Sequence, residues 1–96
     1  MKVNINDLGK TIALLLYKLR VNKGNEIELS NDYFWAISPD ELYNPYEYPK
    51  DITLGQLTDE IGEIARLTHV DEAIPYDLKR IANILTALSV ENPIAF

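Results

Sequence analysis

The spacing of the prolines excludes a long helix from the middle of this chain. Pro39, Pro45 and Pro49 follow one another closely. A proline inside a helix removes a backbone donor and clashes with the preceding turn, and the residue before it disfavours helical backbone. We therefore expect only a short helix after Pro39 and an extended or turned segment over residues 43–49, with the longer helices on either side.

The N-terminal residues predict an amphipathic helix of about four turns. Asn4 or Asn6 can cap its start, and Gly24 can end it after a last turn rich in lysine and arginine, which suit the negative end of the helix dipole. Its apolar stripe comprises Leu8, Ile12, Leu15, Leu16 and Leu19. Three further side chains widen this stripe: Ala13, Leu14 and Tyr17. Such a helix is either central in the fold or shared with another subunit.

A β-hairpin is predicted next. Residues 26–29 alternate polar with apolar, residues 33–37 are dense in side chains that suit a pleated strand, and Ser-Asn-Asp lies between them as turn material. In this pairing Tyr33, Trp35 and Ile37 share one face, and the side chain of Phe34 points the other way. Because a two-stranded sheet is marginal alone, we expect its apolar face to lie on the helices.

Two sequence patterns resemble capping boxes. Ser38 can accept a bond from the amide of Glu41, and Glu41 can reach back to the amide of Ser38, with Pro39 at the first helical position. A short helix should therefore begin at Pro39. Residues 53–56, Thr-Leu-Gly-Gln, repeat the pattern, so we expect a second long helix to begin there.

Two long helices complete the predicted elements. The second helix should carry an inner stripe of Leu54, Leu57, Ile61, Ile64 and Thr68. The third should start at Pro75 and continue to about Val90, before Asn92-Pro93 ends it. We therefore predict a single domain over residues 1–96 of the α+β class, mainly helical, with three long helices, one short helix and a β-hairpin.

The sequence contains neither cysteine nor a long apolar stretch. Without cysteine, disulfides and thiolate metal sites are unavailable, which is compatible with a reducing cytoplasm. The longest apolar stretch, residues 12–17, is far shorter than the ~20 residues that cross a bilayer, and it begins too far behind Asp7 for a signal peptide. We expect a cytoplasmic protein that does not bind membranes.

No residue pattern indicates catalysis. His69 is the only histidine, and the four glycines are too scattered for a phosphate-binding loop. His69, Asp71 and Glu72 could hold a metal ion in principle, but three such residues in a connector are usually a solvated loop. The sequence therefore predicts no enzyme, no catalytic residues, no metal and no cofactor.

Negative charge is concentrated in the middle of the chain and interleaved with aromatic residues. Residues 26–63 hold ten carboxylates, six aromatic side chains and a single cation, Lys50, whereas residues 1–24 hold five cations and one anion. The net charge of −6 repels phosphate backbones and favours cationic surfaces. We therefore expect a basic protein partner and no nucleic acid, although acidity can also serve solubility alone.

The candidate partner-binding residues are Asp40, Tyr43, Tyr46, Glu47, Tyr48, Asp59 and Glu63. The three tyrosines lie in the proline-rich segment, which has little helical stripe to bury them, and tyrosine often anchors protein interfaces. Their alternative role is to pack over the hairpin. Asp59 and Glu63 lie one turn apart on a predicted helix. The alternative interpretation of this pair is a solvated acidic face near the N-terminus of the helix.

Residues 33–60 resemble a group of small uncharacterised bacterial proteins. The shared pattern is an aromatic-Trp-x-Ile strand, then Glu-Leu-Tyr, a tyrosine, a proline and Leu-Thr-x-Gly-Gln-Leu-x-Asp-Asp, from which Glu60 departs at the last position. The group implies no particular activity. In size, acidity and lack of catalytic residues the chain is also similar to immunity proteins that neutralise bacterial nuclease toxins, a likeness of type without a diagnostic motif.

Two hypotheses for the function follow. The first is a non-enzymatic protein-binding module, most concretely an immunity-type inhibitor whose acidic, tyrosine-bearing surface covers the active site of a basic toxin. The second is a structural or regulatory homo-oligomer, in which the N-terminal helix packs against a copy of itself. A small enzyme ranks behind both.

Overall fold

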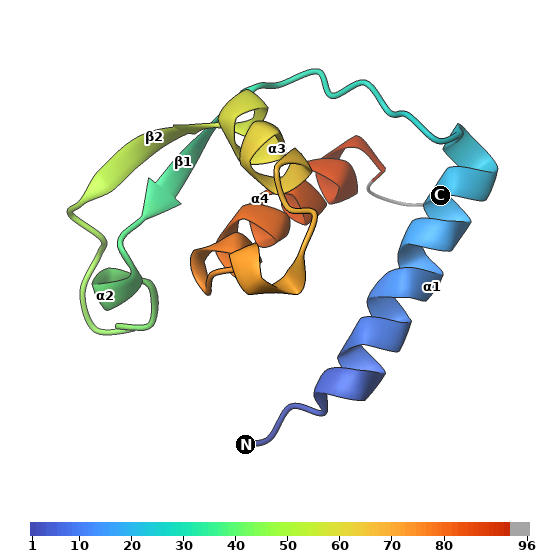
Figure 1. Ribbon diagram of the computed structural model, residues 1–96. Coiled ribbons are helices and arrows are strands. Elements are labelled where there is room, and N and C mark those ends of the chain that lie inside the picture. Colours follow the sequence, from blue (N-terminus) through green and yellow to red (C-terminus); the bar gives the residue numbers. More distant parts are fainter. Residues whose placement is uncertain (93–96) are drawn as a thin grey trace. The chain divides into compact units, whose positions relative to one another are not determined.

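The computed structural model describes residues 1–92, which divide into two compact units, one of Met1–Glu28 with Asn92 and one of Leu29–Glu91. The elements in chain order are α1 (Ile5–Lys23), β1 (Tyr33–Ile37), α2 (Pro39–Leu42), β2 (Ile52–Gln56), α3 (Leu57–Ala65), the 3-10 helix η1 (Val70–Glu72) and α4 (Tyr76–Glu91) (Figure 1). The predicted class is confirmed, because the chain is α+β and mainly helical. Within residues 1–92, no helix has both the length and the apolar character to cross a membrane.

The first helix, α1, begins and ends where the sequence predicts. The side chain of Asn4 accepts a hydrogen bond from the backbone N–H of Asp7 at 2.9 Å, so Asn4 is the cap. Gly24 adopts a φ of 93°, which favours glycine, and its amide donates to the carbonyl of Arg20 at 2.8 Å. Leu19 is buried, but most of the wide apolar surface of α1 is exposed.

The strand pairing differs from the prediction. The described residues 26–29 form no strand, and β1 pairs antiparallel with β2 instead. The predicted hairpin partner is therefore wrong, although the second unit does contain a two-stranded antiparallel sheet. Residues 53–56, predicted to open a helix, belong to β2. The register sets Trp35 opposite Leu54 and Phe34 opposite Gly55, and these cross-strand pairs are the contacts that stabilise a sheet.

The two faces of this sheet differ in what covers them. A Cβ atom at Gly55 would overlap the ring of Phe34, so the missing side chain lets this ring lie against β2. Phe34 is half-buried and lines a cleft of about 340 Å³ together with Asn83 of α4. Trp35, on the other face, is 73% exposed. The expectation that the face of Tyr33 and Trp35 lies on the helices is therefore wrong, and Phe34, which points the other way, is the half-buried aromatic residue of β1.

Neither predicted capping box forms. The short helix α2 does begin after Ser38 with Pro39 in its first turn, but the Ser38 side chain makes no capping bond. Glu41 does not reach back to Ser38 either, because its carboxylate is bound to backbone amides near the start of β2. The helix starts instead with Pro39 in its first turn, and the carbonyl of Ser38 accepts the amides of Glu41 and Leu42 at 3.0 Å each.

A residue from before β1 caps the next helix, α3. The Oδ1 of Asp32 accepts hydrogen bonds from the N–H and the hydroxyl of Thr58 at 2.8 Å each, and its Oδ2 accepts one from Nε2 of Gln56 at 2.7 Å. The bond from Gln56, followed by those from Thr58, lowers the pKa of Asp32 below its usual range. The carboxylate that starts α3 is therefore far from it in sequence, which no local capping pattern could predict.

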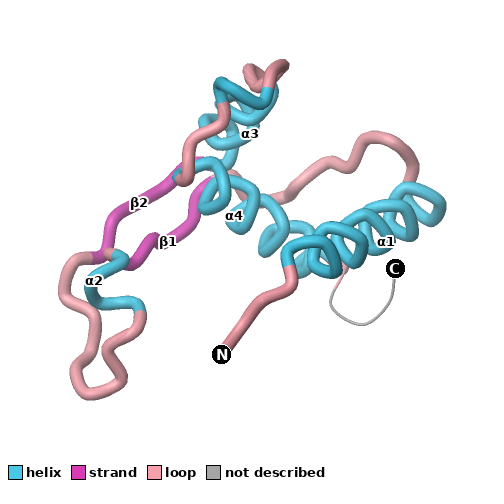
Figure 2. The backbone as a smooth tube through the Cα atoms, turned by 60° about the horizontal axis from the view of Figure 1, so that its bottom comes forward, coloured by secondary structure: helices cyan, strands magenta, loops and turns pink. Residues whose placement is uncertain are grey.

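The helices α3 and α4 pack against each other, and Leu57 at the start of α3 is 4% exposed. α4 ends at Glu91, close to the predicted Val90, whereas Pro93 of the predicted stop lies outside the described residues. Figure 2 shows β1 and β2 side by side, with α2 at one end of the sheet and α3 at the other. Residues of α2 and residues of α3 therefore lie at opposite ends of the sheet.

Candidate protein-binding site

The connection from α2 to β2, residues 43–51, is called the tyrosine loop below. Its base is tied by Glu41, whose Oε2 accepts hydrogen bonds from the backbone N–H groups of Lys50 and Asp51 at 2.9 Å each. The N–H of Ser38 also donates to the carbonyl of Asp51 at 3.4 Å. One carboxylate thus closes the loop at the end of the sheet, in place of the capping role that the sequence suggests for it.

The three tyrosines of this loop point into solvent. Tyr43, Tyr46 and Tyr48 are 87%, 92% and 94% exposed, so they do not pack over the hairpin as the alternative prediction required. A turn within the loop is held by Asn44, whose Oδ1 accepts the N–H of Tyr46 at 3.1 Å. The loop therefore presents three aromatic rings on a backbone with its own hydrogen bonds.

Five of the seven candidate residues lie in one short segment, and two do not. Asp40 and Glu47 are exposed beside the tyrosines in α2 and the loop, whereas Asp59 and Glu63 lie on α3, at the opposite end of the sheet. The strands of five residues hold these ends roughly 14 Å apart at ~3.4 Å per residue. Glu63 is also paired with Arg66, whose Nη2 lies 2.9 Å from its carboxylate. The candidate site is therefore the tyrosine loop with Asp40.

Sequence reasoning missed the exposed apolar face next to this loop. This outer face comprises Tyr33, Trp35, Ile52 and Leu54, which are 60%, 73%, 50% and 59% exposed. They share one face because Trp35 lies opposite Leu54 and the others follow at two-residue spacing. The alternation of Ile52, Leu54 and Gln56 was the signal for a strand here, and the capping-box interpretation of the same residues concealed it.

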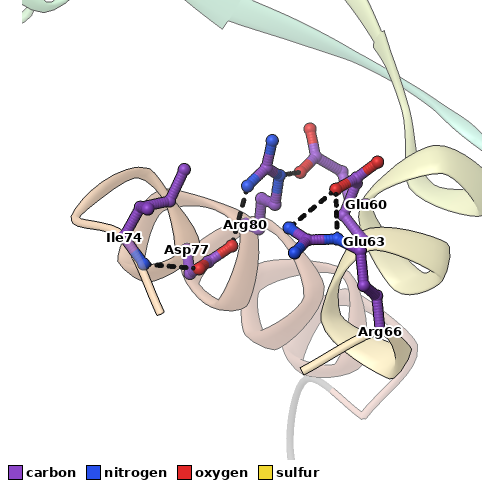
Figure 3. A network of polar contacts seen from close by, with 6 residues as sticks. All are labelled: Glu60, Glu63, Arg66, Ile74, Asp77 and Arg80. Carbon is purple, nitrogen blue, oxygen red and sulfur yellow. Dashed lines mark hydrogen bonds and ion pairs between the residues drawn. The ribbon is translucent and has the colours of Figure 1, made fainter. Parts of the chain in front are cut away.

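Charged side chains also join α3 to α4 (Figure 3). Arg80 donates from Nη1 to Oδ1 of Asp77 at 2.7 Å, and its Nε lies 3.6 Å from Oε2 of Glu60 on α3. Its guanidinium also stacks on Tyr76, 4.6 Å from the ring centroid. Arg80 is thus held by contacts with three side chains in the junction between the two helices.

This network supports a structural role. The N–H of Ile74 donates to Oδ2 of Asp77 at 2.9 Å, and this bond, with the one from Arg80, lowers the pKa of Asp77. The hydrogen bond with Asp77 raises the pKa of Arg80. Both groups therefore stay charged at neutral pH, and neither is poised for proton transfer. The buried Oε2 of Glu60 has no hydrogen-bond partner, since Nε of Arg80 lies 3.6 Å away. Glu60 and Arg80 therefore form an ion pair without a hydrogen bond.

The residues considered for a metal ion do not converge. Within residues 1–92 no three His, Asp or Glu side chains are grouped so that they could hold one. Oε1 of Glu72, the last residue of η1, instead accepts a hydrogen bond from the hydroxyl of Thr68 at 3.5 Å, and His69 and Asp71 are exposed. That the protein is not an enzyme stays a prediction.

No protein family, curated protein or solved structure matches this chain. The resemblance of residues 33–60 to the small bacterial proteins therefore stays a prediction, as does the likeness to immunity proteins.

Proposed function

We propose that this protein is a non-enzymatic binding module whose tyrosine loop binds a basic protein. The observation that carries the proposal is the near-complete exposure of Tyr43, Tyr46 and Tyr48 on a loop tied at its base by Glu41. A ring in solvent adds little to the stability of the fold, whereas tyrosine is one of the residues that most often anchor interfaces. These rings therefore serve contact with another molecule.

The hydrogen bonds of the loop support this function by reducing the cost of binding. Each rotamer-rich side chain or loop that becomes ordered on binding costs free energy, about 0.5–1.5 kcal/mol for one side chain. The bonds from Lys50 and Asp51 to Glu41, and from Tyr46 to Asn44, already order the backbone of the loop in the free protein. The tyrosines are therefore presented on a backbone that needs little rearrangement.

Charge supports a basic partner. Asp40, Glu47 and Asp51 are exposed in or beside the loop, and Lys50 is the cation among them. Complementary charge mainly accelerates encounter and excludes acidic partners, rather than adding affinity. The most concrete form of the proposal is an immunity-type inhibitor that acts in the cytoplasm and covers the cationic active site of a bacterial toxin.

Titration calorimetry against a basic protein, beginning with any toxin domain found encoded next to this chain's gene, tests the proposal. Tyr46→Ala should weaken binding by about 2 kcal/mol or more, roughly 30-fold, as loss of an interface anchor does. Its melting temperature should stay that of the native protein, because the ring buries almost no surface within the chain. Raising the salt concentration should slow association measured by stopped-flow mixing, since charges are screened over ~10 Å at 0.1 M ionic strength.

Tyr17→Ala is the matched control, since Tyr17 is an exposed tyrosine on α1 outside the loop. It should bind like the native protein. Equal affinities for Tyr46→Ala and Tyr17→Ala would remove the aromatic anchor from the proposal. An association rate that does not change with salt would remove the electrostatic part.

Exposure of α1 favours homo-oligomerisation as a second candidate function. Ile5, Leu14, Tyr17 and Val21 are each more than half exposed on this helix of 19 residues. A helix with apolar side chains on several sides is usually covered by another element or subunit. Light scattering should then give twice the mass of one chain, and Leu14→Glu should restore the monomer while Tyr46→Ala does not.

A further inference from the structure

The free edge of β1 is the side of this strand that β2 does not cover. Within residues 1–92 the sheet has two strands, so β1 pairs along one side only (Figure 2). The amide of Leu57 donates to the carbonyl of Asp32, and the amide of Ser38 donates to that of Asp51, so the residue pairs just beyond each end of the strands are bonded. Bonded and non-bonded pairs alternate in an antiparallel ladder. The even-numbered residues of β1 therefore direct their backbone groups toward β2, and its odd-numbered residues direct them outward.

Three residues of β1 thus offer backbone groups on the free edge: Tyr33, Trp35 and Ile37. In the part of the chain that the structure describes, their outward N–H and C=O groups form no other backbone hydrogen bond. The strand contains neither a charged residue nor a proline, the residues with which proteins often block the edge of a sheet. An extended backbone has donors and acceptors at the spacing of this row, so it is the ligand that the edge fits.

A cleft of about 300 Å³ lies along this edge, between β1 and α4. Tyr33 and Trp35 line it from one face of the strand and Phe34 from the other, so the cleft passes around the edge of β1. Its lining on α4 includes the apolar side chains of Ala87 and Val90, and no residue of β2 is among the described residues that line it. The cleft can therefore receive the apolar side chains of a strand added to β1.

The charge of the cleft favours a basic ligand. Among the described residues that line it, Glu91 alone is charged. Its Oε1 accepts a hydrogen bond from the backbone N–H of Ser30 at 2.9 Å, which holds the carboxylate near the Tyr33 end of β1. A cation at this end of an added strand meets an opposite charge, whereas an acidic segment is repelled.

We infer that the free edge of β1 receives an extended segment of about five residues, which adds a third strand to the sheet. The segment places apolar side chains in the cleft and a lysine or arginine near Glu91. It belongs to the basic partner, whose existence rests on the proposed function. A third strand also supplies support that a two-stranded sheet lacks. Since α2 and then the tyrosine loop follow the Ile37 end of β1, the same partner can contact both.

The probe is a synthetic peptide of about nine residues, in which alternating valines and threonines are flanked by lysines. One control peptide has glutamates in place of the lysines. The second control keeps every side chain but carries methyl groups on its central amide nitrogens, so it cannot donate hydrogen bonds to β1. The controls separate the contribution of charge from that of the backbone without altering the protein.

Hydrogen exchange followed by NMR is the readout. In the free protein the outward amides of Tyr33, Trp35 and Ile37 should exchange quickly, and those of Phe34 and Ala36 slowly, because only the latter are bonded to β2. The lysine peptide at saturation should slow exchange at the three outward amides at least about 10-fold, and neither control peptide should do so. The emission of Trp35, the only tryptophan of the chain, should shift to shorter wavelength over the same titration.

Substitutions at Tyr33 separate the backbone from the ring. Tyr33→Pro removes an outward N–H that β2 does not use, so the pairing of the two strands should remain. It should bind the lysine peptide at least about 5-fold more weakly than Tyr33→Ala, the matched control, which loses the ring but keeps the donor. Slow exchange at Phe34 and Ala36 should persist in both variants and would show that the sheet is intact.

The outcomes separate this inference from the tyrosine-loop proposal. Unchanged exchange at the outward amides, equal binding of the N-methylated peptide, or equal affinities of the two Tyr33 variants would overturn the inference, while the affinity of Tyr46→Ala for the basic protein still decides the loop. Protection of Ile52 and Leu54 instead would place the added strand on β2 and also overturn it. So would protection of the β1 edge without peptide, together with a doubled mass, because a second copy would then occupy the edge. Peptide binding at this edge with native affinity of Tyr46→Ala would support the strand site and remove the loop.

Discussion

Replacing Gly55 by alanine should drive a methyl group into the ring of Phe34. The two residues lie opposite each other in the sheet, and a Cβ at position 55 would overlap the far edge of the ring. Overpacking of this kind costs about 1–3 kcal/mol, while alanine recovers about 0.5–1 kcal/mol that glycine costs within a strand. We expect Gly55→Ala to lower the free energy of unfolding by about 1 kcal/mol.

A second substitution isolates the contribution of the ring. In Phe34→Ala the ring is absent, so adding Gly55→Ala should be neutral or stabilise by up to about 1 kcal/mol. The coupling energy between the two substitutions should therefore be about 1–2 kcal/mol, a size typical of residues in direct contact. Urea unfolding of the native protein, both single variants and the double variant, followed by circular dichroism, measures it.

The result that refutes this reasoning is an equal cost of Gly55→Ala in both backgrounds. The ring of Phe34 would then not lie over Gly55, and the assignment of the two faces of the sheet would lose its basis. The placement of Trp35 on the opposite face from Phe34 would be in doubt with it. The experiment therefore tests the packing on which the outer face depends.

Two further predictions concern carboxylates that bind backbone amides. Glu41→Ala should lower the free energy of unfolding by about 1 kcal/mol, because it removes the acceptor of two amides. Ser38→Ala should change this free energy by less than about 0.5 kcal/mol, because the Ser38 side chain makes no capping bond. Urea unfolding measures both, and similar losses for the two variants would contradict these roles. The lowered pKa of Asp32 means that its stabilisation is complete above the usual aspartate value of about 3.9 and disappears as pH falls through the folded value. The stability gap between the native protein and Asp32→Asn should therefore close in acid, and a gap independent of pH would contradict the assignment.

The positions of α1, α2 and α4 were predictable because the signals for them lie within or next to each helix. The cap at Asn4 and the stop at Gly24 each directly adjoin the end of α1 that they determine, and the apolar period lies between them. Pro39 and Pro75 likewise stand at the starts of α2 and α4. Each of these residues acts on backbone groups within about four positions, so the sequence alone determines where these helices lie.

The strand pairing was not predictable from such signals. Residues 53–56 fit a capping box and also, with Ile52 before them, an alternating strand, and both interpretations are locally consistent. Contacts with distant residues decide between them: Phe34 lies over Gly55, and Asp32 binds the amide of Thr58 that starts α3. Such pairs form only after the chain folds back, so tertiary structure overrides the local pattern.

For the site, the sequence determined the chemistry, and the tertiary structure determined its arrangement. Tyrosines and acids between prolines, with no helical stripe to bury them, indicated a binding segment before any fold was known. Only the fold placed Asp59 and Glu63 at the far end of the sheet, assigned Glu41 to the base of the loop and left Trp35 in solvent. The exposure of a side chain depends on what packs over it, and the residues that do so are set by the whole fold rather than by its neighbours in sequence.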